Sequence, residues 1–250
     1  AMREELGMMP NEMMLLFVGQ HIWEKNIRFI LESLALLKDQ PFHFFMVGTG
    51  YAVHDIRMLI GQLGLSHRVT LLGNIYDRER LKRIYAAADL FLFPSLYDTC
   101  GLVVREAAAM HTPSILLRES TAATAITDGI NGFLTHNDPV DFIQQITYLM
   151  NRPEEIARVG EKAAKTISRS WESVIEEVAL RYRDLQESFR LKQGMYIGYY
   201  FRRINENFVS TSFYAHTAGD VCCRAVTSQN GYGCCESIYL DLAQCGTSIC

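Results

Sequence analysis

No stretch of the sequence has the length of uninterrupted apolar residues that a membrane-spanning helix needs, which is ~20 residues. The longest nearly uncharged apolar stretches lie near Met13–Gly19 and Leu90–Pro94 and are much shorter. The first residues also lack the pattern of a secretory signal. The 250 residues carry a net charge of only −4, so no strongly basic surface indicates a nucleic-acid partner. With an apolar content of 49%, these absences favour a soluble globular protein.

Cysteine is scarce through most of the chain. Residues 1–221 contain only Cys100, whereas the other six of the seven cysteines fall in residues 222–250. A body with so few thiols is typical of a reducing compartment, and we expect a cytoplasmic protein. The composition changes in the same part of the chain, because residues 196–250 contain seven charged residues and no lysine. We therefore distinguish a main body, which ends near Lys192, from a cysteine-rich tail.

The tail, residues 193–250, leaves three interpretations open. Its cysteines are Cys222, Cys223, Cys234, Cys235, Cys245 and Cys250. They do not follow the CxxC spacing that is usual for zinc sites, although their number would allow three disulfides. The alternatives are a disordered or non-native segment, a packed extension, and a metal site.

Along the body, short β-prone apolar runs alternate with amphipathic segments that favour helix. The expected strands are Met13–Val18, Phe42–Val47, Arg68–Leu72, Asp89–Phe93, Pro113–Leu117 and Phe133–Leu134. The expected helices are Lys25–Lys38, Asp55–Leu63, Asp77–Ala88, Gly101–His111, Pro139–Met150, Pro153–Ser168 and Trp171–Leu191. The strands lack period-two alternation, which is typical of strands that are buried on both faces of a parallel sheet.

This alternation predicts an α/β fold, a Rossmann-like doubly wound parallel sheet with helices on both faces. We interpret residues 1–12 as a tag scar and interdomain linker, residues 13–170 as the Rossmann-like domain, and residues 171–192 as a C-terminal helix before the tail. In such sheets a ligand binds beyond the carboxyl ends of the strands. The loops that follow the strands are therefore the places where functional residues are expected.

The loop from Pro94 to Gly101 is the richest of these in chemistry. It joins a strand to a helix, and the free amides at the start of a helix favour an anion, typically phosphate. Asp98 precedes this helix and Glu106 lies in its second turn. Because carboxylates repel phosphate, sugar hydroxyls are their natural partners. The alternative is that Asp98 is only a helix N-cap and that Glu106 is a solvated helix residue.

Several motifs, in the same order, resemble the C-terminal, nucleotide-sugar-binding domain of family-4 retaining glycosyltransferases, which have the GT-B fold. The family pattern has an acidic residue, seven intervening residues and a glutamate, within a stretch such as P-S-x-x-E-x-x-G-L-V-x-x-E-A-x-A. Asp98 and Glu106 have this spacing. The other matching segments are Phe17–Gly19, Glu24–Asn26, Tyr85–Asp89, Pro94–Ser95, Gly101–Val103, Glu106–Ala107, Ala109 and Asp128–Gly132. The resemblance extends over residues 3–190.

The resemblance implies a donor-binding site for a nucleotide-diphosphate sugar. Its members are Gly19, Gln20, Lys25, Ile75, Asp98, Gly101, Leu102, Val103 and Glu106. Lys25, a point charge suited to phosphate oxygens, would hold the diphosphate together with the backbone amides of Leu102 and Val103. Asp98 would hold and orient the donor sugar, so Lys25 and Asp98 are the implied catalytic residues.

Three further roles follow from the same resemblance. Glu106 would bind the ribose hydroxyls, and the backbone near Ile75 would contact the base. Gly19 would allow the chain to approach the phosphates closely, because it has no side chain. Gln20 stands where the family usually has arginine, so one cation that faces the phosphates is missing.

Two more departures from the family pattern concern the sugar. Asp98 is one methylene shorter than the usual glutamate, which changes the sugar hydroxyl that it can reach. Thr124 stands where the family often has a glutamate, four residues before an Asp-Gly turn. These differences leave open which sugar the site accepts.

The implied reaction is transfer of a sugar from a nucleotide donor, with UDP-sugar favoured, to an unknown acceptor. No Asp-x-Asp pair occurs, so neither a metal site nor a required cofactor is implied. GT-B enzymes have two facing Rossmann-like domains, and these 250 residues have no room for the N-terminal one. We therefore expect that domain as a partner and expect the chain to be inactive alone. A lipid acceptor would bring peripheral membrane association.

Two rival interpretations remain. A sugar-nucleotide epimerase has a similar two-domain build and would bind the same class of ligand, but would return an isomerised product. A non-catalytic nucleotide-binding module is the other alternative, which the departures at Gln20 and Asp98 make plausible. Consumption of a UDP-sugar with release of UDP separates both from a glycosyltransferase.

Overall fold

The computed structural model describes residues 2–37, 40–96, 98 and 101–205, with side chains as far as Lys192. The six cysteines of the tail lie outside these residues, and so does Cys100. The chain divides into two units, residues 1–175 and residues 176–250. Helix α8, Trp171–Asn205, begins in the first unit and runs beyond its predicted end at Leu191. Among the helices described, none combines the length and the apolar character that crossing a bilayer requires.

The first unit contains a six-stranded sheet in which every pairing of neighbouring strands is parallel. The strands are β1 Met13–Val18, β2 Phe42–Val47, β3 Val69–Gly73, β4 Leu90–Leu92, β5 Ser114–Leu117 and β6 Phe133–Thr135. Their order in the sheet is β3-β2-β1-β4-β5-β6, the arrangement of a doubly wound Rossmann-like fold. The predicted fold class is therefore confirmed.

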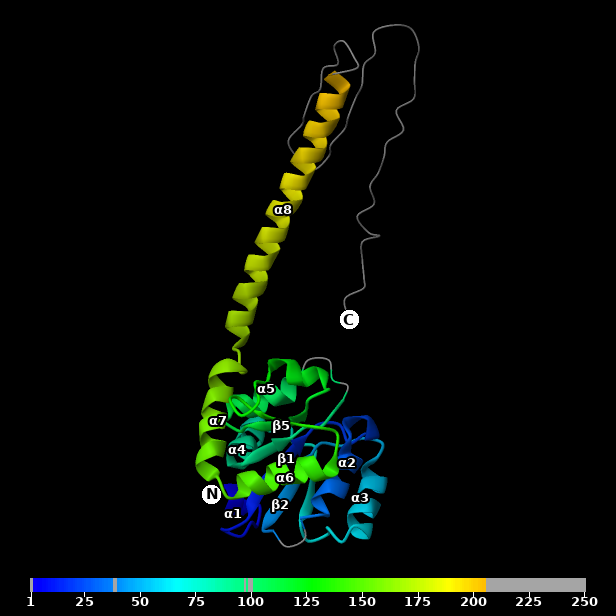
Figure 1. Cartoon of the computed structure of the whole chain (residues 1–250), viewed down its shortest axis with the longest axis vertical. Helices are drawn as coiled ribbons and strands as arrows, with labels where there is room; N and C mark the ends of the chain where they lie inside the picture. Colours follow the sequence, from blue (N-terminus) through cyan, green and yellow to red (C-terminus); the bar gives the residue numbers. More distant parts are fainter. Residues whose placement is uncertain (1, 38–39, 97, 99–100, 206–250) are drawn as a thin grey trace. The chain divides into compact units, whose positions relative to one another are not determined.

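Helices cover both faces of this sheet (Figure 1). They are α1 Met2–Glu5, α2 Ile27–Leu34, α3 Val53–Gln62, α4 Arg78–Ala87, α5 Leu102–Ala109, α6 Pro139–Met150 and α7 Pro153–Thr166, with short 3-10 helices η1 Trp23–Lys25 and η2 Thr121–Ala125. Helices α2, α3 and α6 pack together, and α1, α4, α5 and α7 form the other group. Two of the helix starts follow directly from sequence, because Asp77 caps α4 and Asp138 caps α6, each by accepting two backbone hydrogen bonds.

Phenylalanine rings stack in the core near the carboxyl ends of β1 and β4. Phe17, Phe91 and Phe93 are at most 1% exposed, and their rings stack with centroids 6.2 Å apart for Phe17 and Phe93 and 5.8 Å apart for Phe91 and Phe93. Burial of each such side chain contributes about 1.5–3 kcal/mol. The loops that follow β1 and β4 therefore start from rigid points in the sheet.

One predicted helix, Lys25–Lys38, is wrong in its start. Lys25 closes the short helix η1, and Asn26 then adopts a left-handed conformation with φ of 58° before α2 begins at Ile27. Asparagine tolerates this conformation better than most residues, so it can break one helix and start another. The consequence is that Lys25 lies on a separate turn, apart from α2.

The first twelve residues are not all irregular. Helix α1 lies in this segment and contacts α4, with Met2 and Met8 buried. Arg3 pairs with Asp89 through an Nη2–Oδ1 distance of 2.6 Å. The segment is thus packed on the Rossmann-like domain.

Candidate functional site

The candidate site lies where the sheet changes direction. From β1 the chain proceeds to β2 on one side, and from β4 it proceeds to β5 on the other, while β1 and β4 pair with each other. Ligands of doubly wound sheets bind beyond the carboxyl ends of the strands at this switch point. The loops that follow β1 and β4 meet there, because the Asn26 side chain donates a hydrogen bond to the Pro94 carbonyl at 3.1 Å.

The structure brings the two predicted catalytic residues into direct contact. Lys25 Nζ donates to Asp98 Oδ2 at 2.6 Å, and the two side chains are only 19% and 14% exposed. The ammonium group also lies 5.5 Å from the centroid of the Phe93 ring, at a distance that allows a cation–π interaction. An ion pair so far removed from water is stronger than an ordinary surface pair.

The carboxylate of Asp98 also engages the start of helix α5. Asp98 Oδ1 accepts a hydrogen bond from the Gly101 amide at 2.8 Å. Gly101 itself is the N-cap residue, with φ of 55°, and it brings no side chain to the first turn of the helix. Asp98 is therefore more than a helix cap, because one of its oxygens holds the turn before α5 while the other holds Lys25.

Thr121 holds the backbone of Asp98 through two hydrogen bonds. Its hydroxyl donates to the Asp98 carbonyl at 2.6 Å and accepts from the Asp98 amide at 3.2 Å. Thr121 begins η2, whose next residue, Ala122, lies near Gly101. No local sequence pattern indicates this contact, because it joins residues 23 positions apart on two different loops.

Glu106 lies one helical turn beyond Leu102 on α5, so the two residues share a face of the helix, and both are exposed. The hydroxyl of Tyr85, on α4, donates to Glu106 Oε2 at 3.1 Å. Burial, and then the charge of Glu106, raise the pKa of the Tyr85 phenol far above its usual range. Tyr85 belongs to a motif that the sequence suggested, but its contact with Glu106 was not predicted.

The loops after β1 and β2 are packed backbone to backbone. The Gly19 amide donates to the Val47 carbonyl at 3.0 Å, and a Cβ at Gly48 would lie 2.0 Å from the Gly19 carbonyl oxygen. A Cβ at Gly50 would lie 2.4 Å from the His21 carbonyl oxygen. Only glycine allows this approach, which supports the loop that carries Lys25.

His21 belongs to the loop that carries Lys25, and only 1% of its surface is exposed. Within the described residues, neither of its ring nitrogens has a hydrogen-bond partner, and its ring centroid is 6.0 Å from that of Phe17. Burial lowers the pKa of His21 and so favours the neutral imidazole.

Gln20 and Ile75 are two other residues of the predicted donor-binding site. Gln20 is exposed on the loop after β1. Ile75 lies on the loop after β3, two strands away from β1, and is partly buried against the core. Neither residue takes part in the contacts of Lys25 and Asp98 described here.

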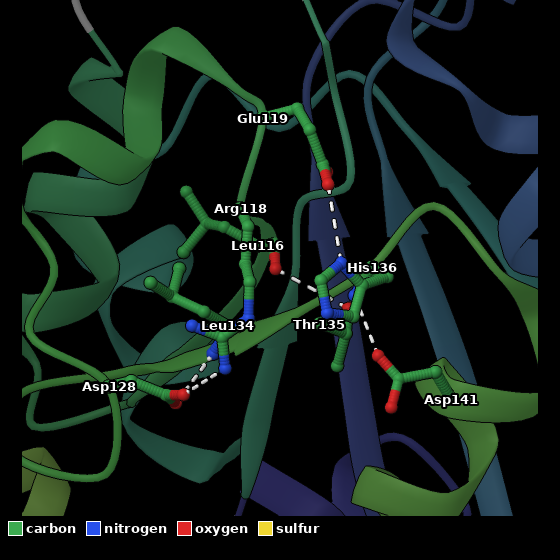
Figure 2. Close-up of polar contacts among 8 residues, drawn as sticks. All are labelled: Leu116, Arg118, Glu119, Asp128, Leu134, Thr135, His136 and Asp141. Atoms are coloured by element: carbon green, nitrogen blue, oxygen red, sulfur yellow. Dashed lines mark hydrogen bonds and ion pairs between the residues drawn. The ribbon is translucent and has the colours of Figure 1, made fainter.

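A second group of polar residues lies beyond the carboxyl ends of β5 and β6. Figure 2 shows Asp128 paired with Arg118 and accepting the Leu134 amide at 2.9 Å. His136 Nδ1 lies 3.3 Å from Glu119 Oε1, and both pairs, Arg118–Asp128 and His136–Glu119, are substantially exposed. Exposed pairs of this kind stabilise little. In the part of the chain that the structure describes, no three acidic, histidine or cysteine side chains converge as a metal site.

Solved structures share this architecture. The Anabaena protein HepE, crystallised in complex with UDP and glucose, aligns with a TM-score of 0.64 and 22% identity over 73% of this chain and 51% of its own. Sucrose-phosphate synthase from Thermosynechococcus elongatus aligns with a TM-score of 0.66 and 23% identity over 75% of this chain and 49% of its own.

Curated proteins are similar in sequence. A D-inositol 3-phosphate glycosyltransferase of Catenulispora acidiphila is 32% identical over 210 residues, which cover 74% of this chain and 49% of that protein. An uncharacterized glycosyltransferase of Methanocaldococcus jannaschii is 29% identical over 142 residues, 56% of this chain and 36% of that protein. The chain thus spans half or less of the length of these two relatives.

The predicted resemblance to a GT-B glycosyltransferase domain is confirmed at the level of the family and of the fold. The family described as "Glycosyl transferases group 1" matches residues 1–166, which include all six strands, Lys25, Asp98 and Glu106. The chain therefore belongs to the group 1 glycosyltransferases.

Proposed function

We propose that the chain is the nucleotide-sugar-binding domain of a family-4 retaining glycosyltransferase. The observation that carries this proposal is the contact of Lys25 with Asp98 beside the first turn of α5, at the switch point between β1 and β4. A cation and the amides of a helix start together favour a phosphate group. A carboxylate in the same place provides an acceptor for sugar hydroxyls.

In this proposal Lys25 and the amides of Leu102 and Val103 hold the diphosphate of the donor. As the bond between sugar and diphosphate breaks, negative charge grows on the diphosphate, and these groups stabilise it. Asp98 holds hydroxyls of the donor sugar and thereby orients it, while Glu106 binds the ribose. Gln20 adds no charge, so Lys25 supplies the cationic part of this stabilisation.

We assign the base of the nucleotide to the loop after β3, near Ile75, and the close approach to the phosphates to Gly19. UDP is the favoured nucleotide, because HepE, which shares the fold, was crystallised with UDP and glucose. Sugar transfer from such a donor needs no resident cofactor in this proposal.

The acceptor side is assigned to a second domain. The length that the chain covers in its relatives, 49% of the Catenulispora protein and 36% of the Methanocaldococcus protein, supports this division of labour. We expect the chain alone to bind the donor and to transfer sugar very slowly. A body with few cysteines suits a reaction in the cytosol, and a lipid acceptor would bring the enzyme to the membrane surface.

Calorimetric titration of UDP and of GDP into the full chain tests the donor site. We expect saturable binding of UDP, and binding about 10- to 100-fold weaker after Glu106→Ala, since charge-assisted hydrogen bonds to the ribose are lost. Glu154→Ala, which removes an exposed glutamate from α7, is the matched control and leaves affinity unchanged. Failure of the wild-type chain to bind either nucleotide contradicts the proposal.

Incubation of the chain together with the domain that supplies the acceptor side, with a UDP-sugar and an acceptor, separates transfer from epimerisation. Release of UDP together with a glycosylated acceptor is the expected result. An isomerised UDP-sugar would favour an epimerase, and an unaltered UDP-sugar would favour a binding module.

A further inference from the structure

Tyr85 is a buried residue whose only polar side-chain atom meets the candidate site. Its surface is 2% exposed, and its hydroxyl donates to Glu106 Oε2 at 3.1 Å. The two residues come from neighbouring helices, since α4 packs against α5. A buried tyrosine hydroxyl needs a partner, and here that partner is a residue proposed to bind the ligand.

The Tyr85 ring is itself firmly held. It packs edge to face against Phe91 of β4, with centroids 5.7 Å apart. The Thr112 hydroxyl, just before β5, donates to the Tyr85 carbonyl at 2.6 Å. The phenol thus approaches Glu106 from a fixed point in the core, and its raised pKa keeps it a hydrogen-bond donor at neutral pH.

Glu106 has no such rigidity of its own, because it is exposed on the surface of α5. A glutamate side chain that is free in solvent loses rotamer freedom when it binds a ligand. A carboxylate has about four acceptor positions, so a hydrogen bond from Tyr85 leaves the others for two neighbouring hydroxyls. A carboxylate that is already held in one orientation binds such a pair more tightly.

We propose that Tyr85 is a positioning residue, which holds the Glu106 carboxylate in the orientation that binds the ribose hydroxyls of the donor. This inference rests on the proposed function, in which Glu106 contacts the ribose. It assigns to the buried phenol a part in nucleotide recognition without direct contact with the nucleotide.

The test compares UDP with 2′-deoxy-UDP, titrated calorimetrically into the full chain and its variants. Tyr85→Phe removes only the hydroxyl and keeps the ring. We expect UDP to bind about three- to tenfold more weakly to this variant, while 2′-deoxy-UDP, which has already lost one ribose contact, changes much less. The ratio of the dissociation constant for 2′-deoxy-UDP to the dissociation constant for UDP therefore falls.

Tyr148→Phe is the matched control, because it also removes a tyrosine hydroxyl that donates to a glutamate, in this case Glu155 Oε2 at 3.0 Å and not Glu106. It leaves the ratio of UDP to 2′-deoxy-UDP affinity unchanged. Thermal unfolding of each variant reports stability separately from binding.

The outcomes separate this inference from the function on which it rests. If Tyr85→Phe weakens both nucleotides equally, or weakens neither, while Glu106→Ala abolishes the preference for UDP, the inference is wrong and the proposed ribose contact stands. If the wild-type chain binds UDP and 2′-deoxy-UDP equally, the ribose contact of Glu106 is wrong and the role of Tyr85 falls with it. If it binds neither, the proposed function itself is contradicted.

Discussion

Asp98 and a bound diphosphate must compete for Lys25, and this competition can be measured. The Lys25 ammonium is held by Asp98 Oδ2 at 2.6 Å, whereas the proposed donor site needs the same ammonium for phosphate oxygens. The variant Asp98→Asn keeps the size of the side chain and an oxygen that can accept from the Gly101 amide. It removes the negative charge, so we expect UDP to bind more tightly.

The magnitude follows from the burial of the pair. Because the side chains are 19% and 14% exposed, the interaction exceeds that of an exposed pair. A hydrogen bond to a charged group contributes about 1.5–3 kcal/mol and a neutral one about 0.5–1.5 kcal/mol. The difference, about 1–1.5 kcal/mol, lowers the dissociation constant of UDP about five- to tenfold.

A double-mutant cycle assigns the effect to Lys25. Calorimetry with UDP is carried out on the wild type, Asp98→Asn, Lys25→Met and the double variant, with Asp55→Asn as a control for the change in net charge. The gain from Asp98→Asn shrinks in the Lys25→Met background, because only direct repulsion of the diphosphate remains. If Asp98→Asn leaves UDP affinity unchanged or weaker, Lys25 does not hold the diphosphate in the way proposed.

Two further predictions concern the loop that carries Lys25. Burial lowers the pKa of His21 below its ordinary 6.5, so the folded state binds fewer protons than the unfolded state and stability falls as the pH drops below about 6.5. We expect His21→Leu to raise the free energy of unfolding at pH 8 by about 1–2 kcal/mol, since buried nitrogens without partners are removed. The increase is larger at pH 5.5. Equal pH dependence of stability for the wild type and His21→Leu in urea titrations would contradict this. Gly50→Ala forces a Cβ to within 2.4 Å of the His21 carbonyl oxygen, so we expect it to lower stability by about 1–3 kcal/mol. We also expect it to weaken the binding of UDP. Gly61→Ala on helix α3, where nothing lies within 4 Å of the added Cβ, gains up to about 1 kcal/mol, and a loss at Gly61 as large as at Gly50 would refute the packing argument.

The strands were predictable because their signals are local. β1 and β2 have the bounds that their apolar runs indicate, and Asp138 before Pro139 marks the start of α6. Helix α2 was mispredicted at its start because Asn26 interrupts a segment whose apolar spacing reads as one helix.

The candidate site was also predictable only where its signals are local. The spacing of Asp98 and Glu106 could be recognised along the chain, and the βα order placed Lys25 where the loop after the first strand meets the next helix, at the same edge of the sheet. The contacts that hold these residues join positions 21 residues apart for Tyr85 and Glu106 and 23 apart for Thr121 and Asp98. Such contacts depend on how whole helices and strands pack together, and no local sequence pattern indicates them. The roles of the site residues in catalysis stay predictions.

Because β1 pairs with β4, one edge of β1 stays unpaired during synthesis until β4 has been made. Strands β1, β2 and β3 are complete by residue 73 and can pair as soon as they are synthesised, but the other edge of β1 must wait for Leu90–Leu92. Until then a strand of buried apolar residues presents an open edge, which is a template for aggregation. The β1–β4 ladder, once formed, is much shorter than the ladder between β1 and β2. A nucleotide that bridges Lys25 and α5 would therefore hold the two halves of the sheet together across this short ladder. Amide hydrogen exchange at Asp89, whose amide donates to the Met14 carbonyl of β1 at 2.9 Å, should slow when the nucleotide binds.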